Sequence, residues 1–157
     1  MKRIIIKSIA LVVTLFCVAV TWFYLEMWIP YKTVSNSGQW NPDNGFQGEM
    51  PRKKIRDACH KILRYRFAVH YDAFYALEKV GNKDSIPYLI RALKWQNLEW
   101  QNCEFTPCSC CISSLEKLTG MEFEDDHEKW ERWWKETGRY LPFDEEKGQL
   151  ILPENEK

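Results

Sequence analysis

Residues 76–94 read Ala-Leu-Glu-Lys-Val-Gly-Asn-Lys-Asp-Ser-Ile-Pro-Tyr-Leu-Ile-Arg-Ala-Leu-Lys, and this stretch decides the fold. Apolar side chains recur at intervals of three and four on both sides of Gly81, which is the spacing of amphipathic helices. Gly81 is typical of the end of a helix, and Asp84-Ser85 followed by Pro87 is typical of the start of the next one. The stretch therefore predicts two helices joined by a short turn.

The end of the first of these helices occurs a second time. Leu115-Glu-Lys-Leu-Thr-Gly matches Leu77-Glu-Lys-Val-Gly, which lies 38 positions earlier. In this alignment Leu115 takes the place of Leu77, and the same apolar face recurs in both copies. The sequence therefore predicts an internal repeat of helix pairs, with Leu77 and Leu115 as equivalent core residues.

Three further segments have helical spacing. Apolar residues recur over 55–63, Thr106-Pro107 is typical of the start of a helix that ends at Gly120, and Asp125 or Asp126 caps a helix through Glu136. In the last of these, Glu131 can reach Lys135 one turn later. Three tryptophans share a face of this helix and are expected to close the core: Trp130, Trp133 and Trp134.

These segments resemble the HEAT repeats of bacterial proteins. Residues 76–94 carry the resemblance, and residues 115–123 followed by the tryptophan helix resemble the terminal repeat of exported bacterial HEAT-repeat proteins. The resemblance covers residues 51–142 and implies a short α-solenoid of about two helix pairs, closed by the Trp-rich C-terminal helix. It also implies a scaffold for protein–protein interaction. The expected fold class is all-α.

The N-terminal segment has the character of a membrane helix. Residues 8–25 are uncharged and follow Lys2, Arg3 and Lys7. As a helix they rise roughly 27 Å, close to the roughly 30 Å of a bilayer's hydrocarbon core. A cleaved signal peptide starts in the same way, but residues 17–19 form a poor cleavage site.

Aromatic residues after this segment favour a retained helix, because they are typical of the membrane interface: Trp22, Tyr24, Trp28 and Tyr31. The positive-inside rule then places the N-terminus in the cytoplasm and the remaining chain outside it. We expect a transmembrane anchor over residues 1–31, a tether over 32–50, the helical domain over 51–142 and a tail over 143–157.

The cysteines are the most unusual feature of the expected extracytoplasmic part. Oxidising compartments favour disulfides, and Cys103 lies close enough in sequence to bond to Cys108 or Cys110. Cys59 pairs, if at all, with a cysteine of the helix that follows Pro107. Cys111 is expected in the core. The alternative is a thiol-redox or metal-binding protein that uses residues 103–111, although their spacing differs from that of structural zinc sites.

The composition excludes several classes of function. The chain of 157 residues has 22 basic and 22 acidic side chains, so no net charge attracts nucleic acid. Its histidines, His60, His70 and His127, form no metal-binding pair and are expected as surface or capping residues. No nucleotide-binding or hydrolase motif is present. We expect no catalysis and no cofactor, but a membrane-tethered module that binds an unknown protein partner.

Overall fold

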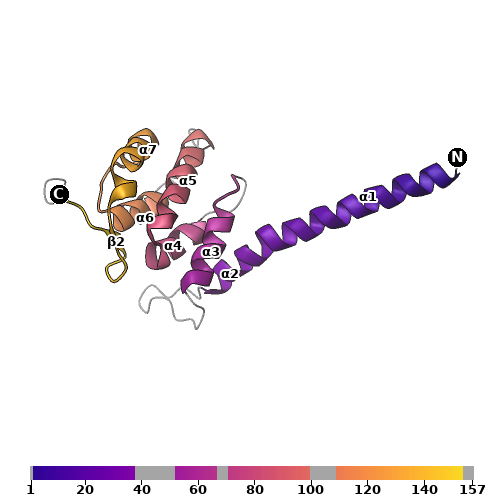
Figure 1. Ribbon diagram of the computed structural model, residues 1–157, viewed down its shortest axis with the longest axis horizontal. Helices are drawn as coiled ribbons and strands as arrows, with labels where there is room; N and C mark the ends of the chain where they lie inside the picture. Colours follow the sequence, from indigo (N-terminus) through magenta and orange to yellow (C-terminus); the bar gives the residue numbers. More distant parts are fainter. Residues whose placement is uncertain (1, 38–51, 67–70, 100–108, 154–157) are drawn as a thin grey trace.

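The structure is a computed structural model that describes residues 2–37, 52–66, 71–99 and 109–153. It is mostly helical, and its only strands within these ranges are two residues long each. A long N-terminal helix projects from one side of a helical domain, and the C-terminal segment lies on the opposite side (Figure 1). The predicted all-α class is confirmed at this level.

The N-terminal helix consists of three consecutive helical segments. These are α1 (Lys2–Phe23), the π-helical turn η1 (Tyr24–Trp28) and α2 (Ile29–Ser37). Pro30 is the second residue after η1. Because proline has no N–H to donate to the carbonyl four residues earlier, a wider turn at this point lets the chain stay helical through it.

Most of the apolar surface of α1 is not covered by the domain. The helix is long and apolar enough to cross a membrane, and its most apolar stretch is fully uncovered by protein. Large apolar side chains are exposed from Ile9 to Tyr31, and Phe16, for example, is 68% exposed. An apolar surface of this extent is typical of a region that contacts a membrane or another protein.

The helical domain is built from α3 (Arg52–Ile62), α4 (Tyr71–Val80), α5 (Ile86–Glu99), α6 (Ser109–Thr119) and α7 (His127–Glu136). Helix α3 packs on α4, α4 on α6, and α5 on both α6 and α7. Short 3-10 turns precede α5 (η2, Lys83–Ser85) and follow α7 (η3, Gly138–Tyr140).

Local signals end α4 and start α7 where expected, but the cap before α5 is Asn82 and not the predicted Asp84-Ser85. Helix α4 ends directly before Gly81, where a Cβ would lie only 2.3 Å from the Leu77 carbonyl oxygen. A capping box between Asn82 and Ser85 starts η2, and the Asp126 carboxylate accepts a hydrogen bond of 2.9 Å from the Lys129 N–H. The predicted start at Thr106-Pro107 lies outside the described residues.

The two copies of the repeat have matching burial. Leu77 and Leu115 are both 0% exposed, and the equivalent positions Val80 and Leu118 are 4% and 1% exposed. One position differs, because Phe74 is fully buried whereas its equivalent Ile112 is only partly buried. The two helices therefore turn the same face to the core.

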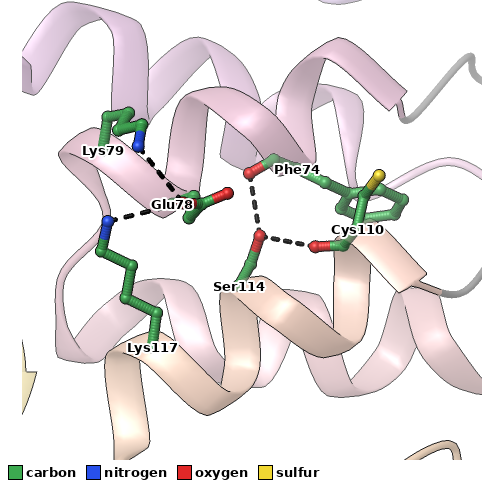
Figure 2. Close-up of polar contacts among 6 residues, drawn as sticks. All are labelled: Phe74, Glu78, Lys79, Cys110, Ser114 and Lys117. Atoms are coloured by element: carbon green, nitrogen blue, oxygen red, sulfur yellow. Dashed lines mark hydrogen bonds and ion pairs between the residues drawn. The ribbon is translucent and has the colours of Figure 1, made fainter. Parts of the chain in front are cut away.

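Polar contacts join α4 to α6 (Figure 2). The buried Ser114 hydroxyl lies 3.0 Å from the Phe74 carbonyl oxygen and 2.8 Å from that of Cys110, so both carbonyls share one small donor between the helices. Near the C-terminal ends of α4 and α6, the ammonium groups of Lys79 and Lys117 lie 3.3 and 3.4 Å from the Glu78 carboxylate.

The predicted tether differs from the structure at its start. Residues 32–37 belong to α2, which packs on α3 and α4. Val34 is 4% exposed and belongs to the core, and Pro30 is buried as well. The tether is therefore wrong for residues 32–37, because burial of an apolar side chain holds this polar segment helical; residues 38–50 lie outside the described residues.

The segment after α7 also differs from the expected tail. Strands β1 (Phe143–Asp144) and β2 (Gln149–Leu150) pair as an antiparallel hairpin whose turn contains Gly148 at a φ of 67°. Leu150 is 4% exposed, and β2 packs on α6. Residues 143–150 therefore belong to the domain.

Candidate functional site

An open groove lies between α5 and α7. Figure 1 shows these two helices in the part of the domain away from α1. The volume of the groove is about 500 Å³. Residues one turn apart on each helix line it: Pro87, Ile90, Arg91, Lys94 and Trp95 from α5, and His127, Glu131, Trp134 and Lys135 from α7. We call this site the α5–α7 groove.

The α5 side of the groove combines an apolar floor with exposed cations. Ile90 is 6% exposed and reaches into the core, whereas Arg91 and Lys94 are exposed. The Arg91 guanidinium lies 5.1 Å from the ring centre of Tyr88 and 5.8 Å from that of Trp95. These cation–π contacts hold the guanidinium across the helix surface.

The α7 side carries an ion pair and a half-buried indole. Lys135 lies 2.8 Å from Glu131, as the sequence predicts for residues four apart. The hydrogen bond from Lys135 lowers the pKa of the Glu131 carboxyl. The ring of Trp134 packs partly against the core and partly lines the groove.

The three tryptophans of α7 have different environments. Trp130 is 0% exposed, and its indole N–H donates to the Glu124 carbonyl oxygen at 3.0 Å. Glu124 has a φ of 51°, so this contact is made by a strained backbone position. Trp133 and Trp134 are only partly buried. Trp130 therefore closes the core, and Trp134 adds an aromatic wall to the groove.

The charges of the groove define what it can accept. Three cations, Arg91, Lys94 and Lys135, face one carboxylate, Glu131, so the groove carries an excess of positive charge. Its aromatic and aliphatic surfaces offer contacts for apolar side chains. This combination suits an acidic chain segment that also presents apolar or aromatic side chains.

Sequence reasoning missed the groove. Its cations look like an ordinary solvated helix face, and only the packing of α5 on α7 brings residues 87–95 beside residues 127–135. A usable signal was the presence of Trp95 and Trp134 on the same faces as these cations, because large indoles are rarely fully solvated.

The described cysteines of the domain are buried. Cys59 and Cys110 are free thiols, and burial raises the pKa of the Cys59 thiol well above its usual range. The Cys111 thiol lies 3.3 Å from the Leu89 carbonyl oxygen in the core. Cys103 and Cys108 lie outside the described residues, so a bridge between these two stays a prediction. Cys59 and Cys110 are free, so the structure shows neither the alternative bridge from Cys103 to Cys110 nor the predicted pairing of Cys59 with a cysteine of α6.

The described histidines have separate roles. The His60 Nε2 lies 2.8 Å from the Ser85 hydroxyl oxygen, and its ring stacks on Tyr88 with ring centres 4.4 Å apart. His60 therefore joins α3 to the start of α5 and is more buried than a surface residue. His127 lines the groove, and His70 lies outside the described residues. Within the described ranges, no cluster of three His, Cys, Asp or Glu side chains could hold a metal ion.

Comparisons with known proteins give no relative. Neither the protein-family profiles, nor the curated proteins, nor the solved structures contain a match to this chain.

Proposed function

We propose that this chain is a membrane-anchored helical-repeat module that binds another protein through the α5–α7 groove. The observation that carries the proposal is the groove itself, which combines Trp95 and Trp134 with an excess of cations on an exposed part of the domain. The expected occupant is an acidic segment of a protein, because a chain segment can follow the length of two helices and place apolar and acidic side chains alternately.

The membrane anchor is α1. Its apolar stretch is exposed over a length that matches the thickness of a bilayer, and three basic residues precede this stretch: Lys2, Arg3 and Lys7. By the positive-inside rule these residues stay in the cytoplasm, and the domain lies on the extracytoplasmic side.

The helical-repeat character rests on the pairing of the helices. Helix α3 pairs with α4, α5 pairs with α6, and the second helices of the two pairs pack on each other. The matching burial of Leu77 and Leu115 supports this interpretation. With only two pairs, α7 serves as the cap that closes one end of a short HEAT-like solenoid.

The alternative, a thiol-redox or metal-binding protein, depends on Cys103 and Cys108. The buried thiol of Cys59 does not favour it, because burial raises the pKa of this thiol and hinders formation of the thiolate. An exposed thiol of low pKa, or zinc bound in stoichiometric amount by the purified protein, would support the alternative.

Charge reversal in the groove tests the proposal. The tagged full chain is purified from its native membranes after mild chemical crosslinking, as wild type, as Arg91→Glu with Lys94→Glu, and as the control Lys53→Glu with Lys54→Glu on α3. All four positions are exposed. We expect a partner protein to be crosslinked to the wild type and to the α3 control. With the groove variant, the recovery of this partner is expected to fall several-fold. Equal recovery from all three proteins would contradict binding through the groove.

A further inference from the structure

The C-terminal end of α3 contacts the N-terminal helix at the level where its uncharged stretch ends. Lys61 lies 3.1 Å from Glu26, which is the first charged residue after residues 8–25. One turn later, the ring of Tyr65 meets the ring of Trp22 edge-on, with centres 5.6 Å apart. The two contacts are four residues apart on each segment and run in opposite directions, so α3 approaches α1 in an antiparallel register.

This register determines how deep the segment after α3 lies in the bilayer that α1 is proposed to cross. Trp22 lies three residues before Leu25, which corresponds to about 4.5 Å along a helix. The headgroup layer on each side of a bilayer is about 5–7 Å thick. If α1 crosses the membrane with residues 8–25 in the hydrocarbon, Tyr65 therefore lies within about 5 Å of the boundary between hydrocarbon and headgroups, the region where tyrosine is favoured.

The residues beside Tyr65 have the chemistry of this layer. Arg64 and Arg66 are both exposed. Interaction with the Tyr88 hydroxyl raises the pKa of the Arg64 guanidinium, so this side chain keeps its positive charge. On the N-terminal helix, the Lys32 ammonium lies 5.3 Å from the ring centre of Trp28. Arginine and lysine next to interfacial aromatic rings are typical of sites that contact lipid phosphates.

We propose that residues 64–66, together with Trp28 and Lys32, form a collar that binds the phosphate headgroups of the bilayer that α1 crosses. This inference rests on the proposed anchoring by α1. The collar fixes the domain against the membrane surface at a second place beside the anchor. Anionic phospholipids are the preferred partners, because Arg64, Arg66 and Lys32 are all cations.

Photocrosslinking to lipid tests the collar. The photoreactive residue p-benzoylphenylalanine is placed at position 65, at Phe16 within the anchor, and at Tyr140 on η3. Tyr140 is 67% exposed and serves as the matched tyrosine on the far side of the domain. Each full-length protein is reconstituted in phosphatidylcholine vesicles, with or without phosphatidylglycerol, and lipid adducts are identified by mass spectrometry.

We expect lipid adducts at positions 16 and 65 and none at 140, and a several-fold preference for phosphatidylglycerol at position 65. Arg64→Gln with Arg66→Gln abolishes that preference, whereas Lys53→Gln with Lys54→Gln at the opposite end of α3 leaves it intact. Adducts at 16 combined with a yield at 65 no higher than at 140 would overturn the collar and leave the anchor standing. Loss of adducts at 16 as well would overturn the anchor together with the collar.

Discussion

Leu77 and Leu115 show how a single residue type anchors both copies of the repeat. Each is fully buried between helices, and each is followed by the same Glu-Lys pair. The lysines that follow, Lys79 and Lys117, both lie beside Glu78 and remain 38% and 45% exposed. Exposed ion pairs of this kind contribute little to stability.

Replacement by alanine distinguishes the buried leucines from the exposed lysines. Leu77→Ala and Leu115→Ala are each expected to lower the free energy of unfolding by about 2–5 kcal/mol, because each leaves a cavity in the core. Lys79→Ala and Lys117→Ala are expected to lower it by less than about 1 kcal/mol. Denaturant unfolding of the full chain in detergent, followed by tryptophan fluorescence, measures both effects. Similar losses at all four positions would show that the repeat alignment is wrong.

His60 makes the stability of the domain depend on pH. Burial, and after it the nearby Arg56, lower the pKa of its imidazole to about 4, against the opposing effect of Asp57 and Asp84. The unfolded chain therefore binds a proton near the ordinary pKa of about 6.5, before the folded chain does. Stability is present above pH 6.5 and is lost as the pH falls toward 4.

We expect the wild-type domain to lose about 1 kcal/mol more than His60→Gln between pH 7 and pH 5, after allowance for solvent screening of a partly exposed ring. Unfolding curves at both pH values, recorded for the two proteins in parallel, measure this difference. An identical pH dependence would mean that the ring protonates as easily in the folded domain as in the unfolded chain.

At the scale of helices, the sequence predicts best where the signal is local. Asp126 caps α7 and Gly81 follows α4 because capping depends on a few neighbouring residues. The helical state of residues 32–37 and the pairing of β2 depend instead on the burial of Val34 and Leu150 against distant elements. Such burial has no signature in the polar segments that surround these residues.

The docking of α2 on α3 is testable through Val34. Val34→Asp places an unpaired carboxylate in the core and is expected to cost more than about 2 kcal/mol. Lys32→Asp, two residues earlier and exposed, is expected to cost far less. Thermal unfolding monitored by circular dichroism compares the two variants. A small effect at Val34 would mean that α2 does not contribute to the core.

The cysteines of α3 and α6 give a prediction about reactivity. In the native protein under non-reducing conditions, Cys59 and Cys111 are expected to resist alkylation until the domain is unfolded, because both are 0% exposed. Peptide mapping of the same sample tests whether Cys103 bonds to Cys108 or Cys110. If all the cysteines after the anchor react as thiols in protein prepared under oxidising conditions, both the bridge and the extracytoplasmic location are wrong.

For the molecule as a whole, the anchor is the most direct prediction. If α1 spans the membrane and is retained, the protein stays with the membrane after washing with alkaline carbonate, and its sequence starts at or near Met1. Fractionation followed by N-terminal sequencing measures both. A soluble form that starts near Val20 would show that the segment is a cleaved signal peptide.

The continuous helix from α1 through η1 into α2 also bears on how the α5–α7 groove would meet the protein partner that we propose for it. A flexible connection would let the domain take any orientation above the membrane. A continuous helix restricts the domain mainly to rotation about the membrane normal and to lateral diffusion. The groove then stays at a nearly constant height above the lipid. If α1 spans the membrane and the groove binds a protein, as proposed, encounter becomes a two-dimensional search that favours proteins of the same membrane whose acidic segment lies at that height.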